Sequence, residues 1–177
     1  AFGAPHIRLL VANARWRRSA IGTRVLLEAY RSTGRPPTTL GSPSFGWTSA
    51  GSPDASVVIF SGTSRPFDLG SLIQGQYVRQ LVKSLTDGRG DLDPEAVRLF
   101  DEHGDEWVLR LGIHHLVIFD GRDTLVPGSW TIRLVVGADD AAGVPYDVDL
   151  AWDGRAETAE EALEDLQVKV KRIRRWR

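Results

Sequence analysis

The 177-residue chain contains no cysteine and no methionine, and only three of its 22 basic residues are lysine. The absence of cysteine excludes disulfides, thiolate catalysis and zinc sites with cysteine ligands. Because methionine is missing even from position 1, we expect that the chain was trimmed or excised from a longer protein. The preference for arginine over lysine, with abundant glycine, alanine and aspartate, indicates a high-GC bacterial genome.

The chain also lacks an excess of either charge and lacks long apolar segments. Its 23 acidic and 22 basic residues leave a net charge of −1, so no global field draws it toward nucleic acid or lipid. No apolar run approaches the ~18 residues that cross a bilayer, and we expect no membrane span. No targeting segment is visible, which leaves the compartment and the oligomeric state open. The length suits one domain with a real core, and we predict a single domain over residues 1–177.

The clearest structural signal is a β-hairpin over residues 130–154, where two alternating runs flank one turn-rich loop. Alternate side chains of a strand point to opposite faces, so each run has a core face and a solvated face. The predicted core faces are Trp130, Ile132, Leu134 and Val136 in the first run and Tyr146, Val148, Leu150 and Trp152 in the second.

Matching these two faces symmetrically predicts the register of the hairpin. Trp130 would lie opposite Trp152. On the solvated face the same register sets Arg133 opposite Asp149, a pair worth ~0.2–1 kcal/mol. A slip of one residue would expose both tryptophans, so we expect the register to be well specified.

Shorter apolar or alternating runs predict further strands, over residues 6–15, 23–30, 55–61, 107–111 and 114–119. A helix over residues 19–31 is the alternative for the second of these, since Ile21, Val25 and Ala29 have helical spacing. We favour the strand because the segment is short and its context is β. Residues 32–54 hold four prolines and four glycines, which predicts a long loop.

Two stretches predict helices. Within residues 72–106, a helical stripe of apolar residues is followed by Asp93-Pro94-Glu95, which is typical of a helix start, and we expect two short inserted helices. Near the C-terminus, Thr158-Ala159-Glu160-Glu161 has the pattern of a capping box. A long helix and a short helix followed by a strand both fit the residues after it. The Val-Lys-Val-Lys alternation favours the strand.

Together these elements predict a mainly β chain, an antiparallel β-sandwich of about eight or nine strands with a short helical insertion. Residues 6–30, where a strand with Val11-Ala12-Asn13 precedes a small-residue turn, resemble the opening of immunoglobulin-like and CARDB-type adhesion modules. Residues 127–154, with Pro127-Gly128 before the hairpin, are similar to the closing strands of such sandwiches. The resemblance implies an immunoglobulin-like sandwich that serves as a non-enzymatic binding or spacer module.

Aromatic residues in predicted loops are candidate binding residues, namely Trp16, Phe45 and Trp47. Aromatic rings in loops can stack on sugars or grip a protein partner. Packing of these rings against the core is the alternative interpretation.

The C-terminal tail over residues 169–177 is a second candidate, because it carries six cations. Arg174, Arg175 and Trp176 are its candidate contact residues. Such a tail can contact nucleic acid phosphates or another anionic surface. A solvated final strand is the alternative.

Aspartates near the hairpin loop are candidate calcium ligands, since calcium takes about six to eight oxygen ligands. Asp139 and Asp140 lie in the predicted loop, and Asp147 lies close to it. A complete site would need a ligand from a neighbouring loop, such as Asp120 or Asp123. A solvated edge with turn-forming aspartates is the alternative, and we expect no other cofactor.

The sequence offers little for catalysis. It has no nucleophile elbow, no P-loop and no dinucleotide-binding glycine motif. His114 and His115 are adjacent, so in a strand they would point to opposite faces and could not bind one metal together. The Ser-Gly-Thr-Ser-Arg sequence at 61–65 lacks the lysine of a phosphate-binding loop and predicts a β-turn.

We therefore expect a non-enzymatic interaction module of a larger protein or assembly, with a protein partner. Recognition would use the 32–54 loop and the helical insertion, because a minimal sandwich needs neither. A calcium-dependent or carbohydrate-binding sandwich is the first alternative, and an enzyme of unknown class is the second.

Overall fold

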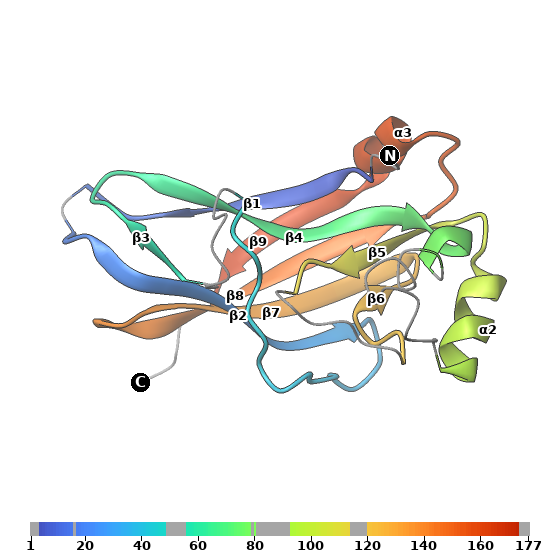
Figure 1. Ribbon diagram of the computed structural model, residues 1–177, viewed down its shortest axis with the longest axis horizontal. Helices are drawn as coiled ribbons and strands as arrows, with labels where there is room; N and C mark the ends of the chain where they lie inside the picture. The colour runs from blue at the N-terminus through green and yellow to red at the C-terminus, as the bar shows by residue number, and fades with distance from the viewer. Residues whose placement is uncertain are drawn as a thin grey trace.

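The computed structural model describes residues 4–15, 17–48, 56–78, 80, 93–113 and 120–173. Within them, nine strands form two antiparallel sheets, and helices lie at one end of the molecule (Figure 1). The prediction of a mainly β, antiparallel sandwich with inserted helices is confirmed at this level.

The two sheets have different widths. The first has the order β1-β4-β5-β6, with β1 at His6–Ala12, β4 at Ser64–Gln74, β5 at Trp107–Leu111 and β6 at Thr124–Leu125. The second has the order β3-β2-β7-β8-β9, with β3 at Val57–Ile59, β2 at Ala20–Ser32, β7 at Gly128–Ala138, β8 at Ala141–Trp152 and β9 at Gln167–Arg172. The core between them includes Leu27, Leu69, Leu72, Leu109, Ile132 and Leu150.

β7 and β8 form the predicted hairpin, but its turn is tighter than predicted. Ala138 pairs with Ala141, so only the two aspartates between them make the turn. A register shift between Val136 and Ala138 marks a bulge beside this turn. Pro145 is accommodated inside β8 because its backbone points toward the end of β9, where its carbonyl accepts the Ile173 N–H at 3.0 Å. Its missing N–H therefore removes no hydrogen bond to β7.

The predicted register of the hairpin is wrong by two residues. Trp130 lies opposite Leu150, and Arg133 lies opposite Asp147 instead of Asp149. The tight turn and the bulge together shift the pairing by an even number of residues. The same side chains therefore face the core as predicted. On the solvated face, each residue therefore lies opposite a different cross-strand partner from the predicted one.

Strands β2 and β3 test the predictions made for the N-terminal part of the chain. β2 is a strand of 13 residues, so the helical alternative for this segment is wrong. β3 is shorter than the predicted third strand, and its apolar run is buried only at Ile59. Val58 and Phe60 are 39% and 58% exposed, because β3 lies at the edge of its sheet.

Strand β4 is not among the elements predicted from the sequence. Pro66 and Gly70 interrupt its pattern, and a bulge opposite β1 lets both Leu69 and Leu72 enter the core. Gly70 is required by close packing, because a Cβ there would lie 2.4 Å from the carbonyl oxygen of Arg110 on β5. Alternation alone therefore gives no signal for this strand.

The helical insertion begins after β4, at residue 75, and not at 72 as predicted. Helix α2, Pro94–Glu102, starts as predicted, with the Asp93 side chain accepting the Glu95 N–H at 2.9 Å. Phe100 of α2 packs on Val108, which points to the opposite face of the first sheet from the main core. The helix thus covers the outer face of the first sheet at one end (Figure 1).

The prediction of a short C-terminal helix followed by a strand is confirmed. Helix α3, Ala159–Asp165, begins with a capping box in which Thr158 and Glu161 each bond the other's backbone. β9 starts two residues after this helix ends. The predicted strand at 114–119 and most of the predicted helical stripe, at 81–85, lie outside the described residues.

The described part of the predicted long loop closes one side of the sandwich. Residues 38–48 follow the edge of β2 and then cross to the first sheet, as the cyan segment of Figure 1 shows. Thr38 forms a bridge with Tyr30 of β2, and Trp47 forms one with Phe67 of β4. We call the side formed by β2, β6 and residues 38–48 the closed side.

Candidate binding surface on the open side

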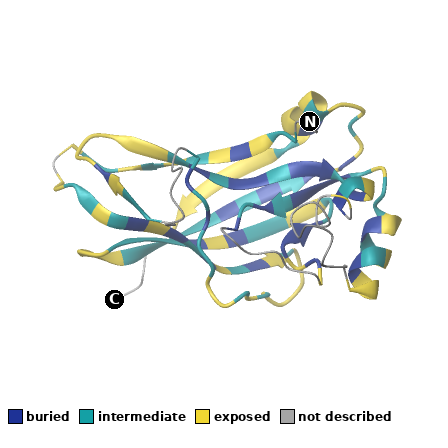
Figure 2. Cartoon of the chain, viewed as in Figure 1, coloured by how far each residue is buried: buried dark blue, intermediate teal, exposed yellow. Residues whose placement is uncertain are grey.

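The opposite side of the sandwich is open. β1 and β9 are the outermost strands there, and each pairs with a single neighbour, β4 and β8 respectively. In the part of the chain that the structure describes, no strand pairs with their outer edges. All six residues of β9 are exposed, and Figure 2 shows the strand in yellow. We call the side formed by β1, β9 and the groove between them the open side.

An apolar groove of about 330 Å³ lies between the two sheets on the open side. Its walls include Leu9, Leu10 and Val11 of β1, Tyr146 and Val148 of β8, and Val170 of β9. Val170 is 51% exposed in the groove, whereas Leu10, which alternates with the core-facing Leu9 and Val11, is 68% exposed on the outer face of β1. Exposed apolar side chains beside an unpaired strand edge are typical of a surface that contacts another chain.

The outer edge of β9 carries unpaired backbone groups whose positions follow from the pairing with β8. The Ile173 N–H donates to the Pro145 carbonyl, on the β8 side. In an antiparallel pair, every second residue directs both backbone groups to the same neighbour, so those of Lys171 and Lys169 also face β8. The residues between them direct their N–H and C=O groups outward; these are Val168, Val170 and Arg172.

The outer face of the second sheet carries a ladder of opposite charges. Arg133 on β7 donates two hydrogen bonds to Asp147 on β8, at 2.9 and 3.1 Å. Lys171 on β9 donates to Asp149 at 2.5 Å, and Thr131 donates to the same carboxylate at 2.9 Å. The Lys171 hydrogen bond holds the pKa of Asp149 below its usual value, and the bond to Asp147 raises the pKa of Arg133. Lysine and aspartate thus join β9 to β8 on this face.

The structure places two of the predicted aromatic binding residues in the core. Phe45 is fully buried and Trp47 is 6% exposed. Both rings pack on Phe67, at centroid distances of 5.8 and 6.2 Å. Their burial matches the core-packing alternative and leaves no ring face for a ligand. Trp16, the third predicted aromatic, lies outside the described residues.

The predicted tail contacts are placed only in part. Residues 167–172 form β9, so the first cations of the tail, Lys169 and Lys171, belong to a sheet. Arg174, Arg175 and Trp176 lie outside the described residues.

The predicted calcium ligands are not brought together. Asp139 and Asp140 are exposed at the hairpin turn. Asp147 lies six residues into β8, about 20 Å along the strand, and is bonded to Arg133. Among the described residues, no group of three or more histidine, aspartate or glutamate side chains is arranged to hold a metal ion.

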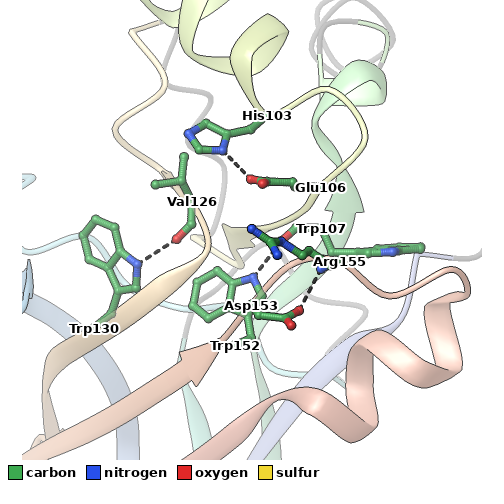
Figure 3. Close-up of polar contacts among 8 residues, drawn as sticks. All are labelled: His103, Glu106, Trp107, Val126, Trp130, Trp152, Asp153 and Arg155. Carbon is green, nitrogen blue, oxygen red and sulfur yellow. Dashed lines mark hydrogen bonds and ion pairs between the residues drawn. The ribbon is translucent and has the colours of Figure 1, made fainter.

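One histidine pairs with a carboxylate where α2 meets β5. The Nδ1 atom of His103 lies 2.5 Å from Oε2 of Glu106 (Figure 3). Next to this pair, three tryptophans each donate the indole N–H to a backbone carbonyl, as Figure 3 shows for Trp130 and Trp152, at 2.8 and 2.6 Å. Trp107 donates to the Ala156 carbonyl at 2.8 Å. These bonds anchor loops to the end of the sandwich, and we assign the pair to the fold.

A buried ion pair on the first sheet has no counterpart among the sequence predictions. Nε of Arg110 lies 3.2 Å from Oδ2 of Asp123, and the two side chains are 16% and 4% exposed. This Nε makes no hydrogen bond, so its attraction to the carboxylate is Coulombic. Burial raises the pKa of Asp123, and the charge of Arg110 opposes that shift. The two side chains form an ion pair, and neither lines the groove on the open side.

The residues of the open side are also missing from the sequence-predicted sites. The Val-Lys-Val-Lys alternation does identify β9 as a strand with one apolar face. It cannot show that this face stays uncovered, because that depends on the first sheet having four strands against five in the second.

None of the helices in the described residues has the length and apolar character needed to cross a membrane. Comparison with protein-family models, curated proteins and solved structures finds no match to this chain.

Proposed function

We propose that this chain is a non-enzymatic interaction module that binds an extended segment of a protein partner along its open side. The observation that carries the proposal is the groove between β1 and β9, where Val170 remains exposed and Leu9 and Val11 are only partly buried, beside two strand edges that pair with no further strand in the described residues. An extended peptide satisfies both features at once, because its backbone pairs with an edge and its side chains fill the groove.

The described aromatic residues of the long loop and of helix α2 serve the fold. Phe45 and Trp47 of the long loop, together with Phe100 of α2, are buried in structural contacts. These buried contacts favour the open side as the recognition surface over the 32–54 loop and the helical insertion, which the sequence suggests. We also propose that the sandwich is of the immunoglobulin-like kind, supported by its two antiparallel sheets and by the β7–β8 hairpin that starts at Gly128.

Peptide selection tests the proposal. A display library of random linear peptides is selected on the wild-type chain, and each selected peptide is measured by fluorescence anisotropy. A double variant, Val11→Arg with Val170→Arg, blocks the groove, because both side chains face the space between the sheets. The control variant Ile21→Arg changes an apolar side chain on β2 that is 56% exposed, away from the open side.

We expect the groove variant to weaken the selected peptides by more than about tenfold, a loss of 1.4 kcal/mol, and the control to leave them unchanged. Circular dichroism establishes that both variants are folded. Peptides that bind the groove variant and the wild type equally would contradict the proposal, as would a selection that yields no binder.

A further inference from the structure

We infer that the segment bound on the open side is a strand with alternating apolar and acidic side chains, and that it pairs with β9. This inference rests on the proposed function and names the chemistry of its partner. The inference follows from the sequence of β8, the strand with which β9 already pairs on its other edge.

β8 is the partner that β9 has in the fold, and its sequence has this alternation. Val148 of β8 lies opposite Val170, and Asp149 lies opposite Lys169. Asp147 lies opposite Lys171 in the next position on the outer face, and Lys171 reaches diagonally to bond Asp149. Each side chain of a strand lies beside its neighbours on both sides, so the free edge of β9 offers the same alternation of valine and lysine.

The free edge also supplies the backbone contacts that a strand needs. The outward N–H and C=O groups belong to Val168, Val170 and Arg172, as the Ile173 hydrogen bond to β8 establishes. A strand added here would place its apolar side chains over the groove beside Leu9 and Val11 and its acidic ones beside Lys169 and Lys171. The exposed fractions of Val168 and Val170, 40% and 51%, are the apolar area that it would cover.

Charge argues against a second copy of this chain as the occupant. Two β9 strands that pair antiparallel with their apolar faces on the same side place lysine opposite lysine, since Lys169 and Lys171 share one face. Like charges directly opposite each other destabilise a strand pair. β1 is a poorer edge for the same segment, because its one cation, Arg8, is bonded to Asp68 at 3.1 Å, whereas β9 presents Lys169 as well as the bonded Lys171.

A peptide with the sequence of residues 146–152, Tyr-Asp-Val-Asp-Leu-Ala-Trp, is a matched probe, because β9 pairs with this sequence in the fold. The peptide is blocked at both ends, and binding to the full chain is measured by anisotropy at low ionic strength. A control peptide carries lysine in place of both aspartates. We expect the acidic peptide to bind saturably and the lysine peptide to bind at least about tenfold more weakly.

The variant Val170→Pro tests the strand edge directly, because it removes an N–H that faces outward and no hydrogen bond to β8. We expect about tenfold weaker peptide binding for Val170→Pro, and a smaller loss for Val170→Ala, which keeps the N–H. Hydrogen exchange on the wild type provides a readout without substitutions. The amides of Val168 and Val170 should exchange fast in the free chain and gain protection when the peptide is added.

The outcomes separate this inference from the proposed function. If library peptides bind the groove but show no acidic preference and no sensitivity to Val170→Pro, the inference is wrong and the proposed function stands. If no peptide binds and the groove variant changes nothing, both fail. A concentration-dependent dimer in sedimentation that Val170→Pro abolishes would overturn the inference in favour of a second copy.

Discussion

The two sides of this sandwich differ in whether a further described segment covers the gap between the two sheets. On the closed side, residues 38–48 lie on the edge of β2 and bridge to β4, and Phe45 and Trp47 fill the space between the sheets. On the open side, β9 extends past the narrower first sheet and its valines stay exposed. The difference indicates which side serves the fold and which is available for a partner, because an unpaired edge beside apolar side chains is costly to leave uncovered.

The largest expected effect comes from removing a side chain that closes the sandwich. Phe45 is fully buried, so Phe45→Ala should lower the free energy of unfolding by about 3–5 kcal/mol. Leu10→Ala on the open side, at a site that is 68% exposed, should change it by less than about 0.5 kcal/mol. Urea unfolding of both variants measures the contrast. Equal losses would mean that the two sides contribute alike to stability and that the distinction between them fails.

Tyr30 offers a second test on the closed side. Its hydroxyl donates to the Arg122 carbonyl at 2.5 Å, and burial raises its pKa to about 12. Tyr30→Phe should cost about 0.5–1.5 kcal/mol of stability. Because the folded pKa lies above the unfolded value of 10.0, the contribution is fully present below pH 10.0 and is lost as the pH rises toward about 12. The difference in stability between wild type and Tyr30→Phe, followed from pH 9 to 11, should shrink in that direction, and a constant difference would refute it.

Two carboxylates with opposite pKa shifts sharpen the comparison further. Lys171 lowers the pKa of Asp149 on the open side. The contribution of Asp149 to the free energy of unfolding is therefore present above the unfolded pKa of 3.8 and is lost as the pH falls through the lower folded pKa. The pKa of Asp123 near the closed side is raised by burial, so its contribution is present below 3.8 and is lost as the pH rises through the higher folded value. Differences in unfolding free energy between wild type and the variants Asp149→Asn and Asp123→Asn should therefore change with pH in opposite directions.

At neutral pH, Lys171→Ala should lower the free energy of unfolding by less than about 1 kcal/mol, because the ion pair of Lys171 with Asp149 is half exposed.

The smallest expected effect concerns calcium. Because Asp147 is bonded to Arg133 and lies far along β8 from Asp139 and Asp140, calcium at millimolar concentration should leave the unfolding midpoint unchanged relative to EDTA. Differential scanning calorimetry measures the unfolding midpoint with calcium and with EDTA. A midpoint that rises with calcium would contradict this prediction.

Much of the fold follows from local signals. Alternation predicts β2, β7 and β8, the capping box predicts the start of α3, and Asp93-Pro94-Glu95 predicts the start of α2. The failures have identifiable causes. β4 is hidden by a bulge and by Gly70, and the hairpin register is shifted by a two-residue turn that composition alone does not distinguish from a longer loop.

The candidate site was harder to predict than the fold. Phe45 and Trp47 attract attention as loop aromatics, yet the loop carries them into the core. Val168 and Val170 look like ordinary core residues of a strand, yet they are exposed. In both cases exposure depends on which segment lies across from the residue, and no local pattern contains that information.

By itself, the sequence determined which residues alternate, which faces are apolar and where the helices begin, because these depend on the periodicity and capping of neighbouring residues. Only the tertiary structure decided that residues 38–48 close one side and that the first sheet stops at β1, one strand short of covering β9. The physical reason is that the width of a sheet and the path of a loop are set by contacts between distant segments. The same apolar face of a strand therefore becomes core where another sheet covers it and stays exposed where none does.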